Sequence, residues 1–373
     1  MRILLFNWRD ITNPQSGGAE VHMHEMFKRV AKLGHRVTLV CCGYPGSRRQ
    51  ETLDGLRIIR LGNWMTYGLL AVRFYALKAR KEHFDLVVED ISKAPLFTPL
   101  YVREPLLAIW HMRHGALLFK EASPPVAAFI CSLESLMPLV YRTTPFVVVS
   151  ESTKAVLVSQ GMDSRRIEII CNGVGGENLE PGRRASAPLV VYVGRVVRYK
   201  QLDHLLRAFR LVRAEIPSTR LIIGGRGNDY ARLRRIVRQL RLDSAVTLAG
   251  ALDEEQKREI LQQAWVYVIP SMQEGWGISV IEANACGTPA IGYDVPGLRD
   301  AIRDRRTGLL VPAGNIDDLA KAIVRVLGED ALREALGRQA LEHAGRFGWD
   351  GAAATLRETL EKVARSKRRL LDK

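Results

Sequence analysis

Two carboxylates and the predicted start of a helix lie close together in the second half of the chain. Glu274 precedes the helix and Glu282 lies one to two turns inside it, so the two side chains reach different parts of one ligand. The amides of Gly277, Ile278 and Ser279 open the helix, where free N–H groups face an anion. The stretch therefore suits a nucleotide-sugar diphosphate, with the first carboxylate at the sugar and the second at the ribose.

A basic pair lies at an earlier turn between a predicted strand and a predicted helix. Arg195 and Lys200 flank the turn after the hydrophobic run at 189–194. A basic pair at this point can neutralise a diphosphate, although two solvated surface cations explain the pair about equally well. The glycine-rich turn at 224–227 lacks the full GxGxxG spacing, so it does not predict a dinucleotide site.

The first half of the chain contributes a glycine pair and a histidine. Gly17 and Gly18 end the loop between the first predicted strand and a helix from 19 to about 33, the position of phosphate-binding loops. Most such pairs only turn the chain, but this position favours a binding role. His111 directly follows a buried strand predicted at 106–110. Because ligands bind at the carboxyl ends of parallel strands, His111 is a candidate for the ligand crevice.

Alternating strands and helices must position these residues. The segment 172–188 is rich in Gly, Pro, Asn and Ser and has no hydrophobic periodicity, which is typical of a linker. The same alternation restarts after it. We therefore predict an α/β protein of two doubly wound parallel-sheet domains that face a cleft, 1–171 and 189–346. The strands expected in the first domain lie at 2–6, 37–41, 57–61, 85–89, 106–110, 146–150 and 166–171.

The 373-residue chain is basic, with 55 Lys and Arg against 40 Asp and Glu and a net charge of +15. This charge favours anionic partners such as nucleotides, phospholipid surfaces or nucleic acid, although a basic solvated surface explains it equally well. The predicted helix at 69–84 is apolar and basic and could lie on an anionic membrane, but a helix that covers a sheet would look similar. We expect no nucleic-acid partner, because zinc spacings, recognition helices and aromatic residues interleaved with basic ones are missing.

The five cysteines are odd in number and form no CxxC pair, which indicates neither a disulfide framework nor a zinc site. The N-terminus shows no leader pattern. No apolar run reaches the roughly 20 residues that a spanning helix needs. We therefore expect a cytoplasmic protein, soluble or peripheral at the inner face of a membrane.

Together these motifs resemble those of the retaining glycosyltransferases of family 4, which have the GT-B fold of two Rossmann-like domains. The resemblance covers nearly the whole chain, and five motifs in order at family-like spacing are highly specific. They are ExxxxxxxE at Glu274–Glu282, GRxxxxK at Gly194–Lys200, GGxE at Gly17–Glu20, NGV at 172–174 and FGW at 347–349.

The resemblance implies a role for each candidate residue. Glu274 would bind the transferred sugar and His111 would lie beside it, and these two are the expected catalytic residues. Gly18 would approach the diphosphate, and the last helix, 347–373, would pack back on the first domain. The residues expected to bind the donor are Gly17, Gly18, Arg195, Lys200, Gly277, Ile278, Ser279 and Glu282.

The resemblance also implies the reaction, the transfer of a hexose-type sugar from a UDP-, GDP- or ADP-sugar to an acceptor hydroxyl with retention. The sequence has no DxD motif, so cations and helix amides are expected to stabilise the leaving diphosphate, with neither metal nor cofactor required. The acceptor would be lipid-linked or a cell-envelope glycan. Two alternatives remain open, a nucleic-acid-binding protein and a relative that isomerises or phosphorolyses sugars.

Overall fold

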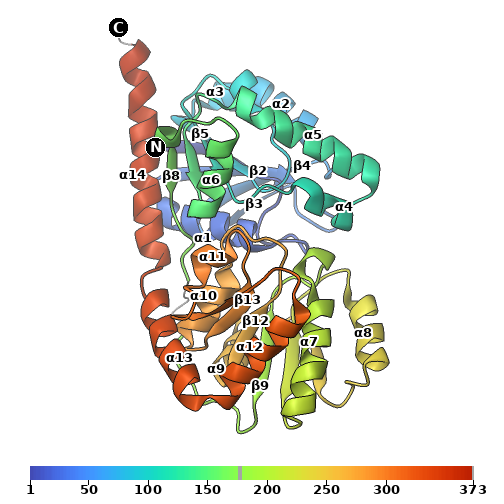
Figure 1. Ribbon diagram of the computed structural model, residues 1–373. Helices are drawn as coiled ribbons and strands as arrows, with labels where there is room; N and C mark the ends of the chain where they lie inside the picture. Colours follow the sequence, from blue (N-terminus) through green and yellow to red (C-terminus); the bar gives the residue numbers. More distant parts are fainter. Residues whose placement is uncertain (175–178, 372–373) are drawn as a thin grey trace. The chain divides into compact units, whose positions relative to one another are not determined.

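The computed structural model describes residues 1–174 and 179–371, so residues 175–178 of the predicted linker lie outside the described residues. The chain forms two compact units (Figure 1). One contains residues 1–173 together with 349–373, and the other contains residues 174–348. The C-terminal segment therefore belongs to the same unit as the N-terminus.

The first unit is built on an eight-stranded sheet in the order β3-β4-β2-β1-β5-β6-β7-β8. All its pairings are parallel except that of β3 with β4, which are joined by a hairpin at Asp54 and Gly55. Both hairpin residues have positive φ, 48° and 84°, as tight two-residue hairpin turns require. The strands are β1 Arg2–Phe6, β2 Arg36–Cys42, β3 Gln50–Leu53, β4 Leu56–Leu61, β5 Leu86–Ile91, β6 Leu106–Trp110, β7 Phe146–Val148 and β8 Ile167–Ile169.

Helices cover both faces of this sheet. Helix α1 and the long C-terminal helix α14 share one core cluster with the sheet, in which Phe27 and Leu356 pack with Leu5. On the other face, Tyr67 of α2 packs with Phe6 and other apolar side chains. The helices are α1 Gly18–Lys32, α2 Tyr67–Phe74, the π-helical turn η1 Tyr75–Ala79, α3 Arg80–Glu82, α4 Leu118–Glu121, α5 Pro124–Val140, α6 Glu151–Ser159 and α14 Trp349–Leu371, and the short 3-10 turns are η2 Thr98–Leu100, η3 Gly115–Leu117 and η4 Ser164–Arg166.

The second unit is built on a six-stranded, fully parallel sheet in the order β11-β10-β9-β12-β13-β14. Its strands are β9 Leu189–Val193, β10 Arg220–Gly224, β11 Val246–Gly250, β12 Val266–Ile269, β13 Ala290–Tyr293 and β14 Gly308–Val311. Its helices are the 3-10 turn η5 Arg198–Lys200, α7 Leu202–Glu215, α8 Tyr230–Gln239, α9 Glu254–Gln263, α10 Ile278–Ala285, α11 Leu298–Ala301, α12 Ile316–Gly328 and α13 Asp330–Ala344. The predicted fold class, an α/β protein with two doubly wound parallel sheets, is confirmed.

The described end of the predicted linker, 179–188, is fastened to the second unit by Arg184. Its guanidinium donates hydrogen bonds to four backbone carbonyls and one hydroxyl, because the ends of α9 and α10 leave carbonyl groups without partners. The acceptors are the carbonyls of Gln262 (3.0 Å), Ala264 (2.8 Å), Cys286 (3.2 Å) and Gly287 (2.6 Å) and the hydroxyl of Thr288 (2.5 Å). This part of the predicted linker is therefore held against the second unit by hydrogen bonds, although its composition is rich in glycine and proline.

In each sheet the first strand lies in the middle, where the connections change direction. Strand β1 pairs with both β2 and β5, and β9 pairs with both β10 and β12. Loops diverge at such a switch point and leave a crevice at the carboxyl ends of the strands. Gly17 and Gly18 follow β1, Lys200 follows β9 and Glu274 follows β12, so these candidates lie at the two switch points.

Candidate functional site

In the second unit, an ion pair joins the loops that follow β9 and β12. The ammonium group of Lys200 contacts the carboxylate of Glu274, and each side chain is only 10% exposed. The two residues are 74 positions apart in the chain. The structure therefore brings together two of the predicted site residues, whose opposite charges offset each other.

Tyr199 holds both predicted cations in place. Its hydroxyl accepts a 2.6 Å hydrogen bond from Nη2 of Arg195. The guanidinium carbon of Arg195 lies 5.7 Å from the centre of the ring, and the ammonium nitrogen of Lys200 lies 5.1 Å from it. Both distances allow cation–π attraction. Sequence reasoning missed Tyr199, although its position inside the GRxxxxK turn could have indicated it.

The backbone at Glu274 is braced from two sides. Its N–H donates to the carbonyl of Pro296 (3.1 Å), and the N–H of Met272 donates to the carbonyl of Tyr199 (2.9 Å). Gly297 has φ 81°, and a Cβ there would overlap the carbonyl of Glu274. Glycine at 297 is therefore needed for this close approach.

Helix α10 starts at Ile278, within the three residues whose amides were expected to open the helix. Gly277 precedes it with φ 93°, a left-handed conformation that favours glycine. The hydroxyl of Ser279 lies 2.7 Å from that of Tyr267 on β12, which itself donates to the carbonyl of Val193 at the end of β9 (2.9 Å). These bonds anchor the first turn of α10 beside the switch point. The first amides of the helix have no carbonyl partner within the helix, so they are available to a ligand.

Glu282 is held by a residue that sequence reasoning missed. The Nζ atom of Lys257 on α9 lies 2.8 Å from Oε1 of Glu282 and 2.7 Å from Oε2 of Glu254. Burial opposes the charge of Lys257, but Glu282 and Glu254 outweigh burial and raise the pKa of the ammonium. No local motif marks Lys257, because the contact joins two different helices.

The glycine-rich turn at 224–227 serves close packing of the backbone. A Cβ at Gly225 would overlap the carbonyl of Gly194, and one at Gly227 would overlap that of Val196. The amide of Gly194 donates to the carbonyl of Gly224 (3.0 Å). These glycines therefore allow the turns after β9 and β10 to touch, which explains them without a dinucleotide.

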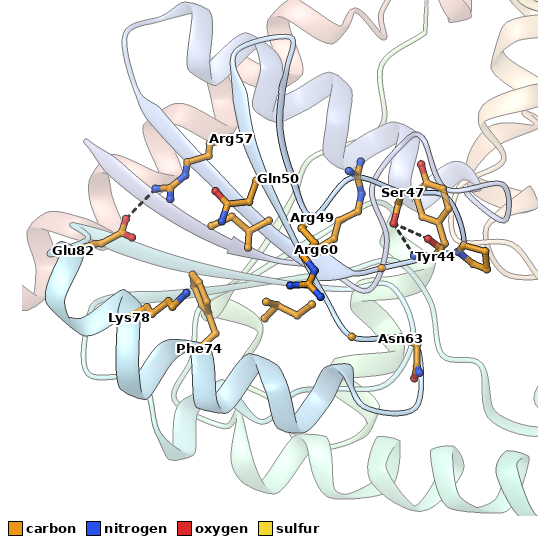
Figure 2. A pocket seen from close by; sticks show the side chains of 15 residues that line it. Tyr44, Ser47, Arg49, Gln50, Arg57, Arg60, Asn63, Phe74, Lys78 and Glu82 are labelled. Carbon is orange, nitrogen blue, oxygen red and sulfur yellow. Dashed lines mark hydrogen bonds and ion pairs between the residues drawn. The ribbon is translucent and has the colours of Figure 1, made fainter.

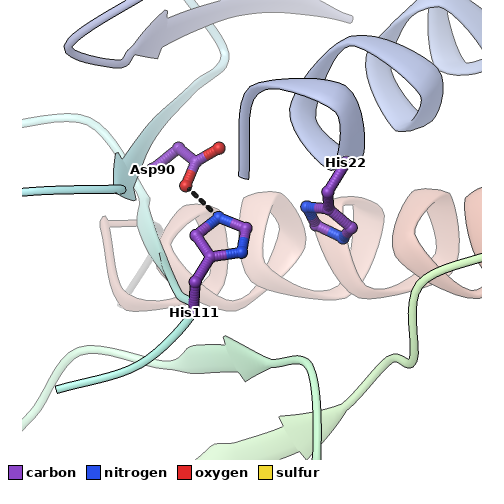
Figure 3. Close-up of side chains that lie close together, drawn as sticks. All are labelled: His22, Asp90 and His111. Atoms are coloured by element: carbon purple, nitrogen blue, oxygen red, sulfur yellow. Dashed lines mark hydrogen bonds and ion pairs between the residues drawn. The ribbon is translucent and has the colours of Figure 1, made fainter. Parts of the chain in front are cut away.

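In the first unit, His111 lies at the end of β6 and is paired with a buried carboxylate (Figure 3). Its Nε2 lies 2.7 Å from Oδ1 of Asp90, the penultimate residue of β5. Burial opposes protonation, but the Asp90 carboxylate, together with the charge of Glu20, raises the pKa of His111. The ring of His22 on α1 packs edge-on against His111, with centroids 5.1 Å apart.

The predicted glycine pair begins α1. Gly17 precedes the helix in an extended conformation, and Gly18 is its first residue. The N–H of Gly17 donates a 2.7 Å hydrogen bond to the carboxylate of Glu20. Glu20, the acidic residue of the GGxE motif, thus caps the helix and is itself buried.

Carboxylates also order the neighbouring loops of the first unit. Asp10 forms a buried ion pair with Arg60, whose Nε lies 2.7 Å from Oδ2. Glu134 of α5 accepts hydrogen bonds from the amides of His114 and Gly115, both at 2.9 Å. These contacts position the loops after β1 and β6.

A cavity of about 750 Å³ lies beside β4 in the first unit (Figure 2). It is lined by Arg49, Arg57, Arg60 and Lys78 with one carboxylate, that of Glu82, among its fifteen residues. Arg57 donates to Glu82 (3.2 Å). None of the predicted site residues lines this basic cavity, so it is separate from the candidate site.

Two family models match the chain and together span most of it. The one described as Glycosyltransferase Family 4 matches residues 16–175, and the one described as Glycosyl transferases group 1 matches residues 179–343. The D-inositol 3-phosphate glycosyltransferase of Streptomyces bingchenggensis is 30% identical over 291 residues, which cover 72% of this chain and 64% of that protein. The chain thus spans less than two thirds of this relative.

Solved structures resemble the chain over nearly its whole length. The sucrose-phosphate synthase of Thermosynechococcus elongatus has a TM-score of 0.84 at 23% identity, covering 98% of this chain and 99% of that one. Anabaena HepE in complex with UDP and glucose has a TM-score of 0.78 at 16% identity, covering 97% of this chain and 100% of that one. At these identities the likeness concerns the fold.

Proposed function

The chain belongs to the family 4-type glycosyltransferases and has their GT-B fold, and from this premise we propose that it transfers a hexose-type sugar from a nucleoside-diphosphate sugar to an acceptor hydroxyl. The observation that carries the proposal is the ion pair of Lys200 with Glu274 at the switch point of the second sheet. It supports the proposal because a cation suited to phosphate and a carboxylate suited to sugar hydroxyls lie in contact with each other.

In this proposal the second unit binds the donor. Arg195, Lys200 and the first amides of α10 neutralise the diphosphate, where positive charge and free N–H groups favour an anion. Glu282 accepts hydrogen bonds from the ribose hydroxyls. When the diphosphate binds the ammonium group of Lys200, the carboxylate of Glu274 is released from that contact and binds the sugar hydroxyls.

The first unit contributes His111 and the turn of Gly17 and Gly18 to the reaction. A charged imidazole stabilises the negative charge that develops as the bond between the sugar and the diphosphate breaks. We propose that the reaction retains the anomeric configuration, by attack on the same face, and that it requires no metal. The leaving phosphate then accepts the proton of the acceptor hydroxyl.

We propose further that the enzyme acts in the cytoplasm on a lipid-linked acceptor, docked on an anionic membrane. Helix α5 supports this, because only Ala127, Glu134 and Met137 of its 17 residues are buried. Phe129 is 63% exposed and Leu139 69%. In the part of the chain that the structure describes, we find no helix with the length and apolar character needed to cross a bilayer.

Helix α2 and the short helical segments η1 and α3 that continue it supply the charge on the same face of the sheet. The connections from β4 to β5 and from β6 to β7 run in the same direction across the sheet, so right-handed crossovers place α2 and α5 on one face. Leu69 on α2 is 81% exposed. The segment 67–82 carries four cations and one carboxylate, which suits a surface of anionic lipid.

The donor reaction is tested by incubating the purified chain with a panel of UDP-, GDP- and ADP-sugars in the presence of EDTA. We expect one donor to raise the melting temperature and to be hydrolysed or transferred. Glu274→Gln and Arg195→Met are each expected to lower kcat/KM by about 100-fold or more. Arg338→Met, at an exposed pair with Glu334 on α13, serves as the matched control and should change nothing.

Several results would contradict the donor assignment. Full activity in both site variants would exclude the proposed roles of Glu274 and Arg195. Conversion of the donor to an epimer, or dependence on inorganic phosphate, would identify an isomerase or a phosphorylase. Binding to DNA or RNA without affinity for any nucleoside diphosphate would favour a nucleic-acid partner. The anomeric configuration of the product, read by NMR, tests retention.

Membrane docking is tested by co-sedimentation with vesicles of phosphatidylcholine, with and without phosphatidylglycerol. We expect binding only to the anionic vesicles, and weaker binding as salt increases. The double change Phe129→Ser and Leu139→Ser should weaken binding, whereas Leu211→Ser, a partly exposed leucine of the second unit, should not. Equal binding by all variants would exclude α5 as the docking surface.

A further inference from the structure

Three ionisable side chains from three different elements meet in the first unit (Figure 3). They are His22 of α1, Asp90 of β5 and His111 after β6, and all three are buried, with 0%, 1% and 8% exposure. Each offers a ligand atom within 4.8 Å of the others. In the described part of the chain, this is the only group of three that could hold a metal ion.

The bond between His111 and Asp90 fits a shared proton better than a metal. Nε2 of His111 lies 2.7 Å from Oδ1 of Asp90, the distance of a charge-assisted N–H···O bond. A metal bound to both atoms would have to replace the proton that joins them directly. The contact therefore indicates that Nε2 is a donor.

His22 completes the cluster without a hydrogen bond of its own. Neither of its ring nitrogens has a partner, and Oδ2 of Asp90 also lacks one. Its ring stands at 81° to that of His111. Burial, and then the charge of His111, lower the pKa of His22 well below the usual value. The environment thus shifts the pKa values of two neighbouring imidazoles in opposite directions, as in sites with assigned acid and base roles.

The groups that face His111 come from two elements. Asp90 approaches from β5, and Glu20 and His22 approach from α1. The carbonyl of His111 accepts a hydrogen bond from the hydroxyl of Thr153 (3.2 Å), which fixes the backbone below the ring. Backbone and ring are therefore held independently.

We propose that Asp90 is the positioning residue of His111: its carboxylate accepts the hydrogen bond from Nε2–H, holds the imidazole in one orientation as imidazolium, and leaves Nδ1–H to donate to the ligand. His22 stays neutral, and its ring packs edge-on against the charged ring of His111. The inference rests on the proposed function only for what the imidazolium does in the reaction. The state of the ring itself is a property of the protein without ligand.

The test compares Asp90→Asn, which removes the charge and keeps the shape, with Asp90→Glu, which keeps the charge. The matched control is Asp54→Asn, because Asp54 makes a second carboxylate–histidine contact of 2.7 Å, to Nε2 of His24 on the same helix as His22. Asp54 lies outside the proposed machinery, and its side chain is 52% exposed. Melting temperatures check that each variant is folded.

Two readouts separate positioning from a merely structural role. In Asp90→Asn we expect kcat to fall about 100-fold or more while the donor KM changes less than about twofold, since positioned proton donors contribute about 10²- to 10⁴-fold to the rate. The carboxylate raises the pKa of His111, so its removal shifts the alkaline limb of the activity profile to lower pH. Asp90→Glu should restore part of kcat, and the control should match the parent.

NMR titration of the histidine ring protons reads the same effect without any reaction. The resonance assigned through His111→Gln should titrate at lower pH in Asp90→Asn than in the parent. An unchanged titration would overturn the inference, whether or not transferase activity is found. A parent without activity but with the expected titration would refute the proposed function alone. A stoichiometric transition metal that is lost in His22→Phe would also overturn the inference about Asp90, because Nε2 of His111 would then be a metal ligand.

Discussion

Substitution of Lys257 by methionine tests the ion pair that holds Glu282. The two charged atoms lie 2.8 Å apart, and both side chains are only 16% exposed. Methionine keeps an unbranched apolar stem and removes the charge. We expect Glu282 to lose its fixed position, so that the donor KM rises while kcat changes little, the signature of lost uniform binding.

The magnitude follows from two opposing effects. At an effective dielectric constant of about 20, unit charges 2.8 Å apart attract by about 6 kcal/mol. Withdrawal of both charges from water cancels most of this gain, since burial costs several kcal/mol per ion. We expect a net coupling of about 1–2 kcal/mol, which corresponds to a rise in donor KM of about 5- to 30-fold.

The assay is a double-mutant cycle of Lys257→Met and Glu282→Gln, with donor KM and thermal unfolding measured for all four proteins. The raised pKa of Lys257 means that its contribution to stability is fully present below the unfolded value of about 10.4 and is lost only as pH rises through the folded pKa. The cycle should therefore give the same coupling between about pH 6 and 9. Lys321→Met is the control, because the side chain of Lys321 is 77% exposed and its nitrogen lies 3.6 Å from Asp318.

Three results would contradict this reasoning. If the two substitutions are additive within about 0.5 kcal/mol, the pair carries no coupling and Glu282 is positioned by the backbone of α10 alone. An unchanged KM in Lys257→Met would lead to the same conclusion. A loss of kcat without a change in KM would indicate that Glu282 stabilises the transition state more than it stabilises the bound donor.

Three further substitutions test packing and charge. Arg184→Met removes the donor that four carbonyls share and should lower the stability of the second unit by about 2–3 kcal/mol, or roughly 6–10 °C in melting temperature. Gly297→Ala should raise the donor KM at least about tenfold, because its Cβ displaces Glu274, whereas Gly328→Ala, which meets no atom, should not. Burial lowers the pKa of His343 to about 4, so stability should fall as pH drops from about 6.5 to 4, and His343→Phe should flatten this dependence in urea titrations.

Local features of the site could be predicted from the sequence. Arg195, Lys200 and Glu274 lie at turns after strands, and Gly277 lies at a helix start, because chain direction and local spacing alone determine such positions. Strand β3 escaped prediction, since QETL is short, polar and half exposed. Its pairing depends on the hairpin that follows it.

The partners of the site residues could not be predicted in the same way. Asp90 and His111 are 21 positions apart, and Lys257 and Glu282 are 25 apart. Such contacts arise when separate elements pack, and no local periodicity encodes them. Arg184 is a similar case, because its acceptors exist only once the ends of α9 and α10 are in place.

The C-terminal helix has a consequence for the order in which the chain can fold. The core beneath α1 includes Trp349, Leu356 and Leu360, residues that are synthesised after the whole second unit. The second unit, 174–348, contains its whole sheet in one continuous segment. Domains made from continuous segments can fold as they emerge during synthesis. The second unit can thus complete its core first. The N-terminal unit keeps apolar surface exposed until α14 has also been synthesised, and chaperones have most reason to act on it during that interval.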